Sequence, residues 1–222
     1  FMIDLIDAFA DKPNLIIITL DTTRADRLGC YGYQQAATPA LDRLAREGVL
    51  FENARVQVPI TLPSHASIMT ATNPVWHGLD SNNQRLPDRN VNTLAEVLRD
   101  KGFRTGAVMG SFVLAKPYGL AQGFDHYNDT MPAGKTGSTA PEITAWEGME
   151  RSIEWIRENK DERFFFWWHI FDPHWPYTAP EPYGSRFRDN PYDGEIAYTD
   201  AAVGQLLSAL DGMDLLDRTF IA

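Results

Sequence analysis

A hydroxyl and a carboxylate stand where the sequence could combine them into one reactive site. Thr61 opens the stretch Thr-Leu-Pro-Ser-His, where a helix is predicted to begin, and Asp21 closes an apolar strand earlier in the chain. A carboxylate can hold a divalent cation, and the cation and the free N–H groups of a helix start would both favour the alkoxide of Thr61. The pair therefore indicates a metal-assisted nucleophile site. A solvated loop Asp and a simple N-cap Thr fit the same two positions.

Histidines supply further candidate groups. His65 lies on the first turn of the helix that Thr61 starts, where it could contact an anion or pack as an ordinary imidazole. Residues 169–177 contain His169, His174 and an Asp after a predicted strand. Such a group could serve as a general acid, a charge clamp or metal ligands, although its spacing is not that of a zinc template such as HExxH. We favour a functional role for His174 and a structural one for His169.

The elements that must position these groups alternate between strand and helix. Near-continuous apolar runs predict buried strands, and Pro, Gly and capping residues mark the helix ends. The predicted strands cover residues 14–20, 49–57, 103–109 and 163–171, with a last one starting near residue 218. The predicted helices cover residues 39–47, 62–71, 92–101, 142–159 and 193–211.

This order predicts a doubly wound, mainly parallel α/β sheet with helices on both faces. Asp21, Thr61 and the 172–177 loop all follow strands, so they could share the sheet edge at which such folds bind ligands. Residues 1–12 are interpreted as a lead-in segment and residues 13–222 as part of a single domain. The chain starts at Phe1 and ends within an apolar run, so we expect the domain to continue beyond it.

Composition excludes several classes of function. With 20 Lys and Arg against 30 Asp and Glu, the net charge is −10, which argues against nonspecific nucleic-acid binding. The single cysteine, Cys30, permits no internal disulfide. Gly134-Lys135-Thr136 looks like the end of a P-loop, but Asp129 stands where that motif needs its first glycine. A Rossmann-type nucleotide binder is disfavoured because no Gly-rich fingerprint follows the first strand.

Six segments, in this order, resemble the N-terminal portion of the sulfatase family within the alkaline phosphatase superfamily. They are residues 13–32, 38–51, 61–67, 93–96, 119–125 and 171–177. The resemblance implies an alkaline-phosphatase-like α/β fold and a divalent metal ion, which could be Ca, Mn or Zn. It implies that the remaining metal ligands follow residue 222. It also implies an ester substrate carried by a small molecule, glycan or lipid, and suggests an extracytoplasmic location, periplasmic or membrane-anchored.

The resemblance also implies roles for individual residues. Asp21 corresponds to the first metal ligand, and Thr22 stands where the family usually has a second Asp. Thr61 corresponds to the nucleophile and to a further metal ligand. His174 corresponds to the family histidine that contacts the ester group, with His65 as a possible companion in catalysis.

This sequence departs from the family at the nucleophile. Sulfatases have Cys or Ser there, in a Cys/Ser-x-Pro-Ser-Arg pattern, and oxidise it to formylglycine. Thr61 cannot give formylglycine because its β-carbon carries a methyl group, so none is expected. Threonine nucleophiles occur in superfamily relatives that handle phosphoric esters, so phosphoryl transfer is favoured over sulfuryl transfer. The alternative, a catalytically inactive binding or scaffold module, is favoured by Thr22, by His65 and by the lack of a Lys-Trp-His-like segment.

Overall fold

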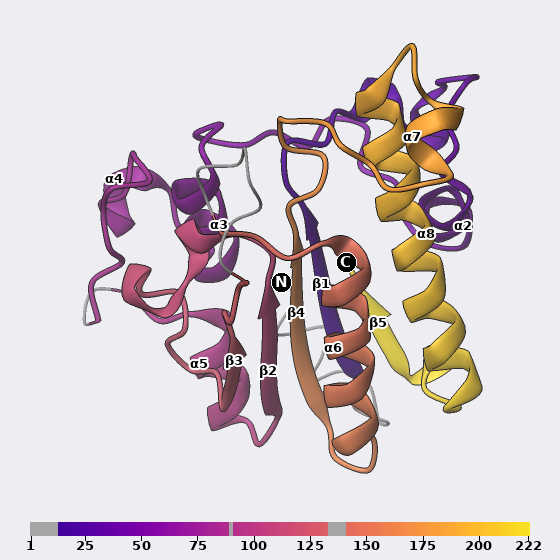
Figure 1. Cartoon of the computed structure of the whole chain (residues 1–222). Helices are drawn as coiled ribbons and strands as arrows, with labels where there is room; N and C mark the ends of the chain where they lie inside the picture. The colour runs from indigo at the N-terminus through magenta and orange to yellow at the C-terminus, as the bar shows by residue number, and fades with distance from the viewer. Residues whose placement is uncertain (1–12, 89–90, 133–140) are drawn as a thin grey trace.

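The computed structural model describes residues 13–88, 91–132 and 141–222, and its centre is one parallel sheet (Figure 1). The five-stranded sheet has the order β3-β2-β4-β1-β5, and each of its neighbouring pairs is parallel. The strands are β1 (Asn14–Leu20), β2 (Arg104–Met109), β3 (His126–Asn128), β4 (Phe164–Ile170) and β5 (Thr219–Ile221). The predicted doubly wound α/β fold is confirmed.

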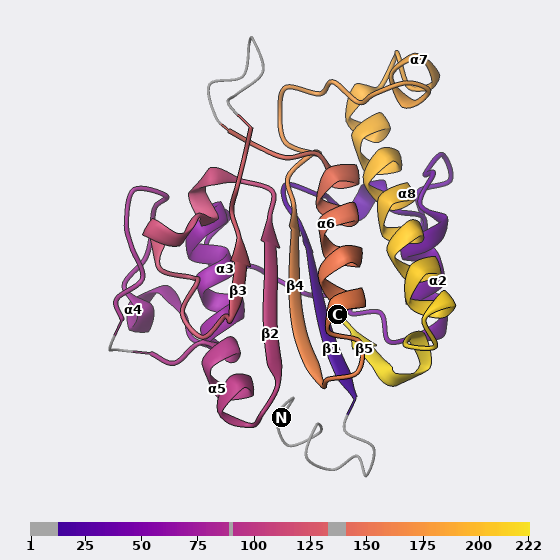
Figure 2. The ribbon, with the colours of Figure 1, turned by 60° about the horizontal axis from the view of Figure 1, so that its bottom comes forward.

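Helices cover both faces of this sheet, as Figures 1 and 2 show. On one face lie α3 (Thr61–Thr70), α4 (Pro74–His77) and α5 (Leu94–Asp100). On the other lie α6 (Ala145–Glu158) and α8 (Pro191–Gly212), with α2 (Pro39–Glu47) and α7 (Tyr183–Arg186) packed against α8. The 3-10 turns are η1 (Ala25–Arg27), η2 (Gly29–Tyr31), η3 (Phe112–Leu114), η4 (Lys116–Tyr118) and η5 (Leu216–Arg218). Among the described residues, the helices include none that is long and apolar enough to cross a membrane.

The central strand β4 explains why the sheet has two cores. All seven of its residues are buried, and successive side chains point to opposite faces. Phe165 and Trp167 enter the core beneath α3 and α5, whereas Phe164, Phe166 and Trp168 enter the core beneath α6 and α8. A strand buried on both faces needs such a continuous apolar run, which the sequence supplies.

Most predicted elements are present, and two differences have physical causes. Residues 49–57 were predicted as a strand, but they form turns and irregular backbone in which Val49, Phe51 and Val56 are 78%, 71% and 60% exposed. Their apolar residues favour a strand locally, but the side of β2 that faces away from β4 pairs with β3 instead. At only three residues, β3 is too short to give a pattern. The predicted lead-in, residues 1–12, lies outside the described residues.

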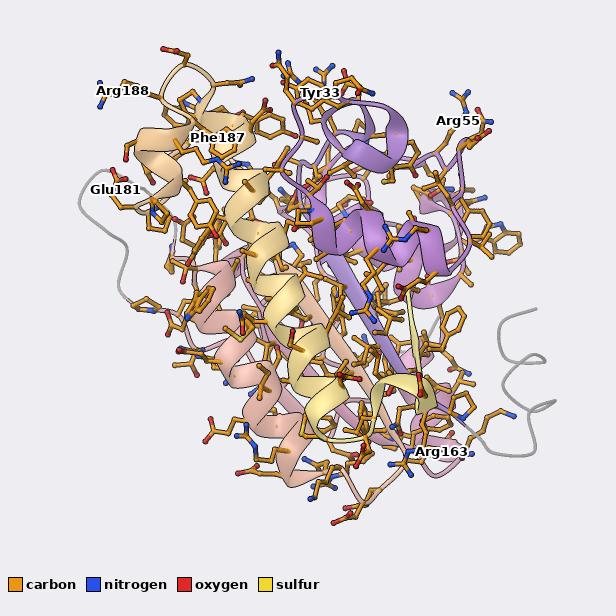
Figure 3. All side chains as sticks on the ribbon, turned by 90° about the vertical axis from the view of Figure 1, so that its right-hand side faces the viewer. Tyr33, Arg55, Arg163, Glu181, Phe187 and Arg188 are labelled. Carbon is orange, nitrogen blue, oxygen red and sulfur yellow. The ribbon has the colours of Figure 1, made fainter. Side chains whose placement is uncertain are left out.

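The pairing of β1 with β4 brings two functional loops together. Leu20 is in register with Ile170, and the N–H of Asp21 continues the ladder by donating to the carbonyl of Ile170 at 2.9 Å. The loops after these two strands therefore begin side by side at the carboxyl edge of the sheet. In Figure 3, Tyr33 marks this end of the molecule and Arg163, just before β4, marks the opposite end.

We predict that Gly123→Ala destabilises the fold far more than Gly32→Ala. Both glycines have left-handed backbones, with φ of 86° and 95°, so each alanine carries a conformational cost of roughly 1–2 kcal/mol. A Cβ at residue 123 would also collide with the backbone N of Glu96, whereas one at residue 32 meets nothing within 4 Å. Urea unfolding should show at least about 1 kcal/mol of extra loss for Gly123→Ala. Equal losses would contradict this account of the contact between residue 123 and α5.

Candidate active site

The structure brings the predicted carboxylate and hydroxyl together. Asp21 is the first residue after β1, and Thr61 is the first residue of α3. The Thr61 hydroxyl donates to Oδ2 of Asp21 at 3.0 Å. Asp21 is 8% exposed and Thr61 is half-buried, so the pair lies at the carboxyl edge of the sheet with limited access to water. The contact joins the end of β1 to the start of α3.

A third group at this carboxylate is His169, to which the sequence assigned a structural role. Its side chain is fully buried, and Nε2 lies 3.4 Å from the same Oδ2 of Asp21, within ion-pair distance. Neither ring nitrogen has a well-formed hydrogen bond within the described part of the chain. The alternation of side chains along β4 indicates which face of the sheet His169 occupies. Its approach to Asp21 also requires that Thr19 of β1 lie opposite His169, and a single sequence does not reveal this register.

Asp21 is ionised at neutral pH because its neighbours outweigh its burial. Burial raises the pKa of Asp21, but the contact and charge of His169, the charge of His65 and the Thr61 hydroxyl together hold that pKa below its usual value. Side chains thus replace the solvent around a negative carboxylate. This is the arrangement that keeps a buried carboxylate available as an oxygen ligand.

His65 is buried behind the nucleophile candidate. Its Nδ1 lies 2.7 Å from the carbonyl oxygen of Thr61, so Nδ1 carries the proton that it donates. Burial, followed by the charge of His169, lowers the pKa of His65 to about 4, so the ring is neutral near pH 7. The ring packs edge-on to His169, with centroids 4.8 Å apart, and lies 5.7 Å from the ring of Trp167. The structure therefore places His65 within the site but beneath Thr61.

The expectation that several free N–H groups would face the alkoxide is wrong. The N–H of Leu62 donates to the side-chain carbonyl of Asn82 at 2.9 Å, and Pro63 has no N–H. The N–H of Ser64 bonds to the carbonyl just before the helix. At most the N–H of Thr61 itself is left for a ligand, so the helix start contributes its dipole rather than a set of donors.

Thr22 points its hydroxyl toward the other loop. This hydroxyl donates to the carbonyl oxygen of Pro173 at 2.7 Å, and the Thr22 backbone has a φ of 51°. The contact ties the residue after Asp21 to the residue before His174. Its role as a metal ligand stays a prediction.

His174 occupies the loop after β4. Its ring stacks on Phe171, with centroids 4.4 Å apart, and its Nδ1 donates to the carbonyl of Trp175 at 2.8 Å. Nε2 is then the nitrogen that can exchange a proton with a ligand. Within the described residues, His174 makes no recorded contact with Asp21 or Thr61 and is linked to them through Pro173 and Thr22.

Oxygen donors of this kind suit a hard divalent cation. The Asp21 carboxylate is ionised, and the Thr61 hydroxyl shares one of its oxygens. No group of three or more His, Cys, Asp or Glu side chains suited to a metal ion occurs among residues 13–88, 91–132 and 141–222. The residues present fit one side of a metal site.

Two acidic side chains, Asp172 and Glu195, lie at the loop that carries His174. Oδ2 of Asp172 is buried without a hydrogen-bond partner in the described structure, and Glu195 of α8 accepts a short hydrogen bond from the N–H of Thr178. Burial, together with the charges of Glu195 and Glu142, raises the pKa of Asp172 to about 8. Asp172 is therefore mainly protonated at neutral pH.

This raised pKa predicts that Asp172→Asn stabilises the protein at alkaline pH. The unfolded chain releases the proton near pH 4, whereas the folded chain keeps it to about pH 8. The unfolded state binds fewer protons in that window, so wild-type stability falls as pH rises. The variant should melt at the wild-type temperature at pH 4 and more than about 3 °C higher at pH 8. The exposed variant Asp88→Asn is the control, and a difference independent of pH would contradict the prediction.

Comparisons with known proteins indicate the family of the chain. A model of the Sulfatase family matches residues 13–222. The chain is 26% identical to arylsulfatase A of Homo sapiens over 96% of this chain and 52% of that protein. It is 28% identical to the ulvan-active sulfatase of Formosa agariphila over 95% of this chain and 49% of that protein. The chain thus spans about half the length of these curated relatives.

Solved structures share the fold. The phosphonate monoester hydrolase of Agrobacterium radiobacter superposes with a TM-score of 0.80 at 20% identity, covering 94% of this chain and 61% of that one. The C-terminal periplasmic domain of EcEptC from Escherichia coli, in complex with Zn, gives a TM-score of 0.72 at 17% identity, covering 94% and 62%. With the family match and the geometry of Asp21 and Thr61, these findings identify the chain as a member of the sulfatase family.

Proposed function

We propose that this chain provides the nucleophile and the first metal ligand of a metal-dependent hydrolase or transferase of phosphoric or sulfuric esters. The observation that carries this proposal is the 3.0 Å hydrogen bond from the Thr61 hydroxyl to the Asp21 carboxylate at the carboxyl edge of the sheet. Ligands bind at that edge in folds of this class.

Asp21 and Thr61 are the residues that would hold the cation, with Thr22 as a third candidate. Their oxygens suit Ca, Mn or Zn, and the remaining ligands would come from residues after 222. When bound, such an ion lowers the pKa of a hydroxyl ligand and offsets the negative charge of the ester.

Thr61, with Asp21 as its proton acceptor, would form the bond to phosphorus, and His174 would protonate the leaving group. The Thr61 proton leaves along its hydrogen bond toward Asp21 as Oγ1 bonds to phosphorus and the bond from phosphorus to the leaving oxygen breaks. His174, in its imidazolium form, gives the leaving oxygen a proton from Nε2. Water then attacks phosphorus and the bond from phosphorus to Thr61 Oγ1 breaks. The proton held at Asp21 returns to Oγ1, one water proton restores His174, and the released phosphate keeps the other. His65, neutral at pH 7, supports Thr61 from beneath rather than supplying charge.

Phosphoryl transfer is favoured because Thr61 can attack phosphorus directly but cannot become an aldehyde hydrate. The fold shared with a phosphonate monoester hydrolase supports this preference. A solved structure with this fold, in complex with its substrate D-glucosamine-2-N,6-O-disulfate, supports a glycan among the alcohols of the ester. A small-molecule or lipid ester fits the same chemistry. An extracytoplasmic location, periplasmic or membrane-anchored, belongs to this proposal on the family resemblance alone.

A catalytically inactive binding module is the second candidate. The engaged Thr22 hydroxyl, in place of a family carboxylate, favours it. It would bind the ester and the cation without turnover.

Thr61→Ala should abolish ester turnover by the protein expressed from its complete coding sequence. We expect wild type, with Mn²⁺, Zn²⁺ or Ca²⁺, to hydrolyse aryl phosphate or bis-aryl phosphate esters faster than aryl sulfate. Thr61→Ala should lose at least about 10³-fold in kcat, and Thr61→Ser should keep most of it. Full activity of Thr61→Ala would refute the nucleophile assignment, and a wild type inactive with every ester and metal would favour the binding module.

Asp21→Asn should weaken metal binding independently of turnover. The substitution removes one negative charge from the donor set, so calorimetric titration with Mn²⁺ should show at least about a tenfold higher Kd. Asp88→Asn, at an exposed position paired with Arg85, is the matched control. Unchanged affinity in Asp21→Asn would place the metal elsewhere.

A further inference from the structure

Tyr192, on the first turn of α8, joins the two loops that carry the candidate site. Its hydroxyl donates to the carbonyl oxygen of Thr22 at 2.7 Å and accepts the N–H of Arg24 at 2.9 Å. Its ring lies against that of Tyr177, with centroids 5.2 Å apart. One half-buried side chain therefore contacts the loop after β1 and the loop after β4.

Thr22 holds a backbone conformation that a β-branched residue rarely adopts. Its φ of 51° lies in the left-handed region. The Thr22 carbonyl accepts a hydrogen bond from the Tyr192 hydroxyl, and the Thr22 hydroxyl donates one to the Pro173 carbonyl. Strained conformations persist when the surrounding structure over-determines them, and they gather at functional sites.

Thr22 lies where its conformation can affect the positions of both Asp21 and His174. Thr22 directly follows Asp21, and Pro173 directly precedes His174. The contact between Thr22 and Pro173 is thus a side-chain link between the segment of the metal ligand and the segment of the proton donor. A general acid acts only when it is held within hydrogen-bond reach of the leaving oxygen, and small displacements are costly.

We propose that Tyr192 and Thr22 act together as positioning residues that fix the separation between the Asp21 carboxylate and the His174 ring. Tyr192 holds the Thr22 backbone in its left-handed state, and this state aims the Thr22 hydroxyl at Pro173. The kinetic consequence of this inference rests on the proposed function, whereas the structural consequence does not.

Hydrogen–deuterium exchange of the protein expressed from its complete coding sequence tests the structural part. Tyr192→Phe keeps the ring and removes both hydrogen bonds. Exchange within residues 171–178, which include the His174 N–H bonded to the Phe171 carbonyl, should become about tenfold faster. Tyr31→Phe, which removes a hydroxyl bonded to the Phe51 carbonyl at 3.0 Å, is the matched control and should leave this segment unchanged.

Variants of Thr22 test the second half of the pair. Thr22→Val keeps the shape and removes the hydroxyl, so it should accelerate exchange in the same segment, and Thr22→Ser should restore protection. Thr219→Val removes a hydroxyl bonded to a backbone carbonyl at the same 2.7 Å, far from the site, and serves as control. If the proposed function holds, Tyr192→Phe should also lower kcat by about tenfold or more with little change in KM.

The outcomes separate this inference from the proposed function. Unchanged exchange in Tyr192→Phe and Thr22→Val overturns the positioning role even if the enzyme is active. Faster exchange spread over the whole chain also overturns it, because Tyr192 would then be a general stabilising residue. Locally faster exchange in a protein that hydrolyses no ester supports the link between the loops and refutes the proposed function alone.

Discussion

An ionised carboxylate buried at the end of a parallel strand is the constraint on which the site depends. Removing a carboxylate from water is costly unless charged and hydrogen-bonding groups replace the solvent. At Asp21 this replacement comes from His169 on β4 and from Thr61 on α3. Satisfying one charge therefore gathers three segments that are distant in sequence, and it places the hydroxyl of Thr61 where chemistry is possible.

A second carboxyl group nearby has the opposite protonation state. Asp172 lies near the carboxylates of Glu195 and Glu142 instead of histidines, and burial with those charges raises its pKa to about 8. Burial raises the pKa of both groups, but at Asp21 the neighbours outweigh burial, whereas at Asp172 the neighbouring charges add to it. At neutral pH the loop after β1 therefore carries a charged carboxylate at Asp21, whereas the loop after β4 carries a mainly neutral carboxyl group at Asp172.

Much of the fold and part of the site could be predicted from the sequence. The apolar runs of β1 and β4 and the Pro and Gly signals at helix ends have local causes, and they located most elements. The strand end at Asp21 and the helix start at Thr61 are local features as well. The role of His169 depends on the register between β1 and β4, and the direction of the Thr22 hydroxyl depends on a rare backbone angle. Both are consequences of long-range packing, so no local pattern reports them.

The nearly uniform apolarity of β4 has a consequence for folding. A strand that is apolar at every position but that of His169 could slide by one residue along β1 with little change in the apolar surface that it buries. Polar contacts penalise such a slide: Phe164 N–H donates to the Asn14 side chain at 3.2 Å, and the Trp167 indole N–H donates to the Thr19 hydroxyl at 3.0 Å. The contact between His169 and Asp21 would likewise be lost if β4 slid by one residue. A contact of the candidate site, between His169 and Asp21, therefore also favours the native alignment of β4 on β1 over its neighbours during folding.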